Sequence, residues 1–201
     1  MKEEARAKRE LEIHQTAARL VAERGYAATS MLTIAKAAKA SNETLYRWYG
    51  DKRGLFLSMV ETNTSATKAK LAKALAGGTD PVRTLNDFAP LLLKLVLGER
   101  AIMLNRAAAM DDTGELGAAI AAAGREALLP LIEGVIEDAM RHGMIEAPSA
   151  LAATGWYFSL LIGDQQVRRV NRVLDEPTHE EIAQRCDDAM GAFWKLCAPR
   201  V

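Results

Sequence analysis

The feature that most constrains this chain is a pair of short helical patterns, residues 32–38 and 42–49, joined by a tight turn and preceded by a longer amphipathic helix. A helix of about eight residues is only marginally stable alone in water. The second short helix must therefore be held against its neighbours, which leaves its outward face free for another task. A rigidly held short helix with a polar outer face is typical of proteins that read the major groove of DNA. The outward residues are Asn42, Thr44, Tyr46, Arg47 and Trp48.

The composition of the chain predicts an all-α protein. With 201 residues, 49% of them hydrophobic, the chain can bury a full core. Alanine is abundant and runs of β-branched residues are rare, which favours helices over strands. No apolar stretch reaches the ~18 residues of a transmembrane helix, and the charged N-terminus lacks the apolar region of a secretion signal. We therefore expect a cytoplasmic protein.

Helix start and stop signals divide the chain into about nine helices. Asp80-Pro81, an N-cap followed by proline, opens one helix, and Gly98 separates it from the next. The spacing of Asp112 and Glu115 is that of a capping box, and it predicts one long helical segment ending at His142-Gly143. The remaining signals are Gly77-Gly78 as a helix end, and Pro148-Ser149 and Thr178 to Glu181 as helix starts.

The net charge is zero, yet the charges are unevenly distributed along the chain. Residues 1–60 carry eleven Lys and Arg against seven Asp and Glu, a net charge of +4, so the remainder carries −4. A locally basic module on an acidic body is suited to binding phosphates with one end of the molecule. Chance asymmetry on solvated helices is the alternative, because charge alone does not distinguish the two.

Two apolar stripes near the C-terminus predict helix–helix packing. Their residues recur at alternating spacings of four and three, a period that suits the left-handed packing of a four-helix bundle. Both helices also carry apolar residues on a second face, so each needs two partners. We expect one partner to be a second subunit related by a two-fold axis, and a helix fully buried within a monomer is the alternative. The residues assigned to the dimer interface are Leu160, Gly163, Val167, Val170, Leu174, Ile182, Cys186, Ala189 and Phe193.

The sequence indicates neither an enzyme nor a metal site. His14, His142 and His179 lie on separate predicted helices, with no nucleophile motif beside any of them. Zinc-ligand spacings and glycine-rich phosphate loops are absent from the sequence, so we expect no cofactor. Cys186 and Cys197 share one predicted helix and lie about 16 Å apart by helical rise, too far to form a disulfide with each other. We expect them to pack as small apolar residues, with a redox-sensing disulfide between subunits as the alternative.

Residues ~10–58 closely resemble the TetR family of transcriptional regulators, in a pattern far more specific than a three-residue motif. The residues that carry this resemblance are Ile13–Ala22, Glu23-Arg24-Gly25-Tyr26, Thr29-Ser30, Ile34-Ala35, Ser41, Thr44-Leu45-Tyr46, Gly50, Lys52 and Leu55-Phe56. The rest of the chain resembles the AefR-type C-terminal subgroup of that family. The residues that carry this second resemblance are Glu115-Leu116-Gly117, Leu129-Pro130-Leu131-Ile132 and Gly163-Asp164.

The resemblance implies a helix-turn-helix domain and a ligand-binding domain. Residues 1–56 would form three helices, of which the second and third make the helix-turn-helix, and residues 57–201 would bind a small ligand and dimerise through their last two long helices. We expect a homodimeric regulator, most often a repressor in this family, that binds a palindromic operator in double-stranded DNA. A small apolar or amphipathic effector would release it. A DNA-binding regulator without an inducer and a helical interaction protein without operator binding are the alternatives.

The outward residues of the recognition helix divide into two groups by their chemistry. Asn42, Thr44 and Arg47 are candidates for reading base edges, because Asn can bond adenine, Arg can bond guanine and Thr can touch a thymine methyl. Tyr46, Trp48 and Lys52 match the family's phosphate contacts, which position the protein on the DNA backbone.

Residues that flank the recognition helix are expected to support DNA binding. Thr29 and Ser30 stand where the preceding helix needs an N-cap, and their hydroxyls can also reach a phosphate. Ser41 is expected to cap the recognition helix. Basic residues near the N-terminus would add phosphate contacts or a minor-groove arm, with a solvated, disordered end as the alternative. These basic residues are Lys2, Arg6, Lys8 and Arg9.

Two positions, Lys39 and Glu43, depart from the family pattern. The turn usually reads Ala-Gly-Val-Ser, whereas this chain has Ala38-Lys39-Ala40-Ser41. The turn demands a positive φ, which a lysine adopts only at some cost, so we expect Lys39 to be strained and compensated by a phosphate contact. Glu43 suits the helix dipole but repels phosphates, unless it accepts a hydrogen bond from a cytosine amino group. Simple stabilisation of the helix end is the alternative for Glu43.

The effector pocket has weaker signals than the recognition helix. Asn105 and Arg106 interrupt the apolar run of residues 101–110, and such a polar pair can orient the acidic or carbonyl group of a ligand. The pair can equally lie on a solvated edge or reach a neighbouring carboxylate. Phe88, Met103, Trp156 and Tyr157 are further candidates, and each is also explained as core packing.

Overall fold

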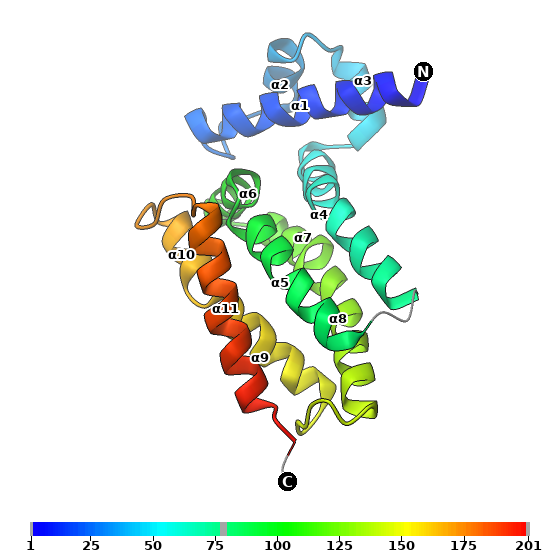
Figure 1. Cartoon of the computed structure of the whole chain (residues 1–201). Helices are drawn as coiled ribbons and strands as arrows, with labels where there is room; N and C mark the ends of the chain where they lie inside the picture. Colours follow the sequence, from blue (N-terminus) through cyan, green and yellow to red (C-terminus); the bar gives the residue numbers. More distant parts are fainter. Residues whose placement is uncertain (1, 77–79, 200–201) are drawn as a thin grey trace. The chain divides into compact units, whose positions relative to one another are not determined.

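The computed structural model describes residues 2–76 and 80–199, and over these residues it is helical with no strand (Figure 1). The prediction of an all-α protein is confirmed, with eleven helices where about nine were expected. The helices are α1 (Lys2–Arg24), α2 (Met31–Ala37), α3 (Asn42–Tyr49), α4 (Lys52–Ala76), α5 (Pro81–Leu97), α6 (Glu99–Ala109), α7 (Glu115–Ala123), α8 (Arg125–Arg141), α9 (Ala150–Ile162), α10 (Gln165–Val170) and α11 (His179–Leu196).

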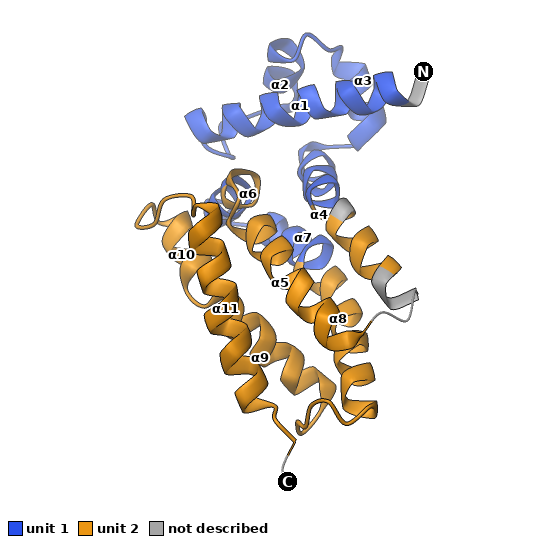
Figure 2. Cartoon of the chain, viewed as in Figure 1, with its two compact units in different colours: residues 1–63, 103–124 blue, residues 64–102, 125–201 orange. Residues whose placement is uncertain are grey.

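The chain forms two compact units (Figure 2). The head consists of residues 1–63 and 103–124, and the body consists of residues 64–102 and 125–201. Helices α4 and α6 each begin in one unit and end in the other. The sequence predicts a boundary after residue 56 and assigns everything beyond it to the body. The structure instead adds residues 103–124 to the head, because their apolar side chains are buried in the core of the helix-turn-helix.

The head holds its short helices in one shared core. α2 packs against both α1 and α3. Ile13 of α1, Ile34 of α2, Leu45 of α3 and Phe56 of α4 are each fully buried in this core, and so is Leu116 of α7. Burial of one such side chain contributes about 1.5–3 kcal/mol relative to exposure. The seven and eight residues of α2 and α3 therefore remain helical through tertiary packing and not through intrinsic helix stability.

The body is a bundle in which α9 packs against α8 and α11, while α5 packs against α8, α9, α10 and α11. Tyr157 and Phe193 are fully buried at its centre, and their rings meet edge to face with 5.7 Å between centroids. The Tyr157 hydroxyl donates to the carbonyl of Leu85 at 2.9 Å. The polar end of this tyrosine is thus satisfied inside an otherwise apolar core.

Several helix starts follow the signals in the sequence. Asp80 caps α5 by accepting from the Val82 amide, and Pro81 follows it at the first helical position. Ser149 caps α9, and Thr178 forms with Glu181 the capping box that opens α11. These predictions are confirmed. The predicted helix end at Gly77-Gly78 lies outside the described residues.

The segment from Asp112 to His142, predicted as one helix, is two. α7 ends at Ala123, Gly124 follows with a backbone far from helical, and α8 starts at Arg125. The capping box predicted from Asp112 is not formed, since Gly114 is the N-cap and has no side-chain bond. The carboxylate of Asp111 takes that role and accepts from the amide of Leu116 at 2.8 Å.

The first apolar stripe is also broken. α9 ends at Ile162, Gly163 follows with a φ of 54°, and α10 covers only Gln165–Val170. Leu174 lies beyond α10. The prediction of one helix through these positions is wrong, because a left-handed glycine ends a helix and redirects the chain. The guanidinium of Arg185 donates to the carbonyls of Leu160 and Leu161 at this break.

Candidate DNA-recognition surface

Both short helices of the head begin at a serine cap. Ser30 accepts from the Thr33 amide at 3.1 Å, and Ser41 accepts from the Thr44 amide at 3.0 Å. Each cap satisfies one of the amides that the first turn of a helix leaves without a partner. The predicted capping roles of Ser30 and Ser41 are confirmed.

Thr29 does not lie on the surface. Its side chain is fully buried, and its hydroxyl donates to the carbonyl of Gly25 at 2.8 Å. It therefore closes the loop that follows α1. The predicted phosphate contact of Thr29 stays a prediction, and it would require this buried hydroxyl to become accessible.

The face of α3 opposite the buried Leu45 carries the predicted reading residues. Asn42, Glu43 and Arg47 are exposed, and Tyr46 is 50% exposed. Thr44 is half-buried, with its hydroxyl 2.7 Å from that of Ser41. The short helix thus buries one side and presents donors, an acceptor and an aromatic ring on the other.

The aromatic residues at the end of α3 face the inside of the head more than the outside. Trp48 is half-buried, with the guanidinium of Arg6 5.2 Å from its ring centroid. Burial raises the pKa of Tyr49 to about 12, helped by the charge of Glu10. Arg6 and Glu10, which act on this pair, both lie on α1, and α1 begins at Lys2.

Lys52 has an internal partner in the structure. Its ammonium donates to the carbonyl of Tyr26 at 2.8 Å and lies 3.9 Å from the centroid of the Tyr26 ring. Burial lowers the pKa of Lys52, and the negative charge of Asp111 opposes that shift. Burial also raises the pKa of Tyr26, and Asp111 adds to the increase. The ammonium has three donors, so a phosphate contact by Lys52 must use one that Tyr26 does not accept. The sequence did not indicate the bond to Tyr26.

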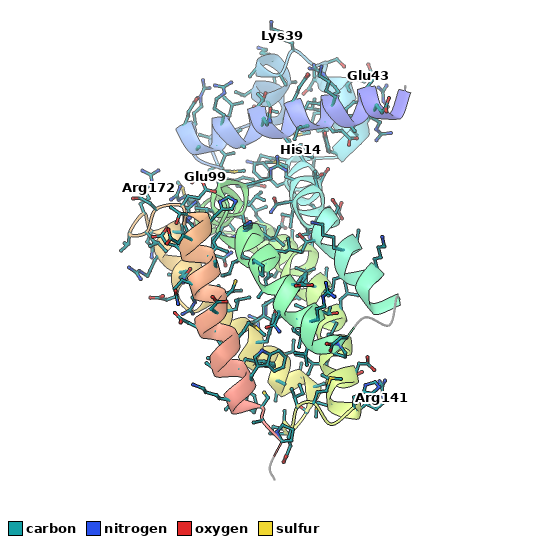
Figure 3. The ribbon with its side chains drawn as sticks, viewed as in Figure 1. His14, Lys39, Glu43, Glu99, Arg141 and Arg172 are labelled. Atoms are coloured by element: carbon teal, nitrogen blue, oxygen red, sulfur yellow. The ribbon has the colours of Figure 1, made fainter. Side chains whose placement is uncertain are left out.

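The turn between α2 and α3 has the strained conformation expected from the sequence. Lys39 has a φ of 51°. Figure 3 labels Lys39 and Glu43, which both lie in the head. The expected compensation was a phosphate contact. The structure shows a protein contact, since Arg9 of α1 donates to the carbonyls of Ala38 and Lys39.

The residues predicted to line an effector pocket do not gather in one unit. Met103, Asn105 and Arg106 belong to the head and are half-buried, whereas the other three belong to the body. Phe88 and Tyr157 are buried in the body core, and Trp156 packs against that core.

The residues predicted to form the dimer interface have mixed environments. Four of them, Ile182, Cys186, Ala189 and Phe193, are buried in the core of the body. Their stripe packs within the chain, and their assignment to a subunit interface stays a prediction. Val167 is 62% exposed. Leu160, Val170 and Leu174 are half-buried, and Gly163 is exposed at the end of α9.

Burial raises the pKa of both Cys186 and Cys197 and disfavours the reactive thiolate.

The sequence did not indicate the two arginine contacts made by Arg9 and Arg185. Arg9 and the carbonyls that it contacts are separated by 29 and 30 residues, and Arg185 is 24 and 25 residues from its acceptors. Backbone carbonyls are present at every residue, so no sequence pattern identifies the pair.

Among the described residues, no group of three or more His, Cys, Asp or Glu is placed to bind a metal ion. None of the described helices is long and apolar enough to cross a membrane.

The fold and the exposed face of α3 define a helix-turn-helix transcriptional regulator. Residues 13–59 match the family described as bacterial regulatory proteins, tetR family, and residues 83–196 match the AefR-like transcriptional repressor, C-terminal domain. The chain belongs to the TetR family of transcriptional regulators, in the group with AefR-like C-terminal domains. Neither family description names an enzyme.

Solved structures have the same fold over nearly the whole chain. A TetR-family regulator from Mesorhizobium loti is 24% identical with a TM-score of 0.75, over 94% of this chain and 96% of that one. The flavonoid-responsive regulator FrrA is 27% identical with a TM-score of 0.69, over 97% and 100%. FadR from Bacillus subtilis, solved with stearoyl-CoA, is 14% identical with a TM-score of 0.72, over 91% and 96%. No curated protein matches the sequence.

Proposed function

We propose that this protein is a cytoplasmic, homodimeric repressor that binds a palindromic operator and leaves it when a small apolar or amphipathic effector binds. The observation that carries the proposal is the outward face of α3, which stays exposed while Leu45 anchors the helix in the head. A short helix mounted in this way fits the major groove. Two heads related by a two-fold axis would read two half-sites of one operator.

Some exposed side chains of α3 would read bases, and others would bind the DNA backbone. Arg47 and Asn42 carry the donors and acceptors that bond guanine and adenine edges. Tyr46 would donate to a phosphate and so set the depth of α3 in the groove. Glu43 adds a carboxylate that suits cytosine and disfavours other bases at one position.

An effector bound in the body can influence the head through continuous helices. α4 begins in the head and ends in the body, and α6 begins in the body and ends in the head. A ligand that favours one arrangement of these helices would favour one spacing of the two heads, and so shift operator affinity. The names of FrrA and of the FadR complex point to flavonoids and acyl-CoA thioesters as the first effectors to test.

Operator binding is tested by a gel-shift titration with the promoter fragment of the protein's own gene. Arg47→Ala should weaken binding by about 1–3 kcal/mol and relax the preference at one base pair. Tyr46→Ala should weaken binding to all sequences alike. The matched control is Arg83→Ala in α5, because Arg83 is an exposed arginine of the body paired with Asp87. Binding unchanged in both α3 variants would remove this surface from the proposal.

The salt dependence of the same titration tests Lys52. If Lys52 binds a phosphate in the complex, Lys52→Ala should reduce the slope of log affinity against log salt by about 0.9. If Lys52 bonds only the Tyr26 carbonyl in the complex, the slope stays unchanged and only the stability of the head falls.

Effector response is tested by adding acyl-CoA thioesters of increasing chain length, and separately flavonoids, to the protein–operator complex. Release of the DNA at rising ligand concentration supports an inducible repressor. DNA binding that no ligand changes favours a regulator without an inducer. Failure of the wild-type protein to shift DNA at low salt would favour a helical interaction protein.

A further inference from the structure

The turn before α3 holds Lys39 in a backbone conformation that residues other than glycine disfavour. Lys39 has a φ of 51°, whereas L side chains strongly prefer a negative φ. The amides of the turn are bonded back to α2, and among them the Ala40 amide, which follows Lys39, donates to the Ala35 carbonyl at 2.9 Å. This bond requires the left-handed conformation of Lys39, so the turn depends on an added source of stability.

Arg9 of α1 supplies a direct contact to that turn. Its Nη2 donates to the carbonyl of Ala38 and to the carbonyl of Lys39, both at 2.7 Å. Its Nη1 donates to the carboxylate of Glu12 at 2.7 Å, which orients the guanidinium. Hydrogen bonds from a charged donor are about twice as strong as those between neutral groups.

The two carbonyls define the conformation of Lys39. The Ala38 carbonyl belongs to the peptide plane before Lys39, and the Lys39 carbonyl belongs to the plane after it. The angle φ turns one plane about the Cα atom and ψ turns the other. A single guanidinium nitrogen that holds both oxygens therefore restrains both angles.

We propose that Arg9 is a positioning residue for DNA recognition, which holds the turn at Lys39 in the left-handed conformation and so fixes the direction of α3. This role rests on the proposed operator binding. Arg9 acts through the backbone and does not itself contact the DNA. Three of its five N–H donors are bonded to protein acceptors, including both on Nη2.

A double-mutant cycle with Lys39→Gly tests the role. Glycine adopts a positive φ without strain, so a glycine at position 39 makes the turn independent of Arg9. Arg9→Ala should weaken operator binding about tenfold when Lys39 is present, because fewer heads have the competent turn. The same change should have an effect of less than about threefold in the Lys39→Gly background. Because Arg9→Ala is compared within each background, the loss of any contact between the Lys39 side chain and DNA cancels.

Arg19→Ala is the matched control, because Arg19 lies on the same helix and pairs with Glu23 at 3.1 Å without touching the turn. It should leave affinity unchanged. Arg9→Lys should fall between wild type and Arg9→Ala, since an ammonium does not reproduce the forked guanidinium. Arg9→Ala should also leave the salt slope unchanged. A slope reduced by about 0.9 would make Arg9 a phosphate ligand and overturn the proposal.

Hydrogen exchange of the Ala40 amide reports on the turn without DNA. Arg9→Ala should speed its exchange about tenfold, and Lys39→Gly should suppress that difference. An equal effect of Arg9→Ala in both backgrounds would overturn the positioning role. If wild-type protein binds no operator while exchange follows the cycle, the repressor proposal fails and the assignment of Arg9 to the turn stands.

Discussion

Head and body use the same chemical device, a cation that donates to backbone carbonyls, for different purposes. In the body, Arg169 donates to the carbonyl of Leu97 at 2.9 Å, and Arg185 donates to the carbonyls at the end of α9. These acceptors lie at helix C-termini, where carbonyls lack helical partners and the helix dipole is negative. The body arginines therefore join the end of one helix to the side of another.

In the head the same kind of donor acts on turns. Arg9 holds the turn before α3, and Lys52 holds the loop after α1 through Tyr26. The Arg169 side chain is 4% exposed, whereas the Arg9 side chain is 34% exposed. Loss of a buried cation leaves desolvated carbonyls behind, whereas carbonyls near solvent can bond to water. The comparison predicts large stability effects in the body, and effects on geometry more than on stability in the head.

The largest expected effect is that of Arg169→Ala. The change removes the bond to Leu97 and the ion pair with Glu99 at 2.8 Å, and it leaves a buried carbonyl unsatisfied. The free energy of unfolding should fall by about 3 kcal/mol, measured by urea denaturation. Arg83→Ala, at an exposed ion pair in the same unit, should change it by less than about 0.5 kcal/mol. Equal losses in the two variants would show that burial of the arginine does not set the size of the loss in stability.

Arg185→Ala should have the next largest effect. Its two carbonyl acceptors lie at the break between α9 and α10, and Arg185 is only half-buried. A loss of about 2 kcal/mol in the free energy of unfolding is expected in the same assay. A loss below the error of the measurement would mean that water replaces the arginine at the end of α9.

The serine caps allow a matched test of head against body. Ser41→Ala in the head and Ser149→Ala in the body each remove one side-chain bond to a helix amide, and each should cost about 1 kcal/mol of stability. Only Ser41→Ala should also weaken operator binding, because only this cap precedes the recognition helix. Gel shifts of both variants check this, and equal weakening would point to a general loss of folded protein.

The smallest expected effect is the pH dependence of two carboxylates near helix starts. Asp111 in the head has its pKa lowered chiefly by the Leu116 amide, and Glu181 in the body has its pKa lowered chiefly by the Thr178 amide. A lowered folded-state pKa contributes stability above the ordinary carboxyl pKa, and that contribution is lost as the pH falls through the lowered value. Between pH about 4 and 2, wild type should therefore lose slightly more stability than Asp111→Asn or Glu181→Gln. NMR titration that finds either carboxyl at its ordinary pKa would contradict the assignment.

Local features of this chain were predictable from the sequence. The bounds of α3, the caps at Ser30 and Ser41, the capping box at Thr178 and the positive φ at Lys39 were all predicted correctly. Each depends on residues within about four positions of one another, which a sequence pattern can contain. The polar outer face of α3 follows from the same local periodicity.

Predictions that required a distant partner were less accurate. Thr29 was expected to cap α2 and reach a phosphate, yet its hydroxyl bonds inside the loop, and Lys52 was expected to bind phosphate, yet it bonds the Tyr26 carbonyl. The stripe on α11 was assigned to a subunit interface, yet it is buried within the chain. The type of a side chain shows which groups it can bond or pack against. It does not show which of several such groups lies near it in the folded chain.

The sequence by itself determined the all-helical class, the helix-turn-helix and the chemistry of its reading face, because helix periodicity and capping are local properties. The tertiary structure alone decided that residues 103–124 complete the head, that Gly163 breaks the first of the two C-terminal apolar stripes, and that Arg9 meets the turn at Lys39. These outcomes depend on which segments come together in space. Backbone carbonyls and apolar side chains occur along the whole chain, so only the folded arrangement selects among them.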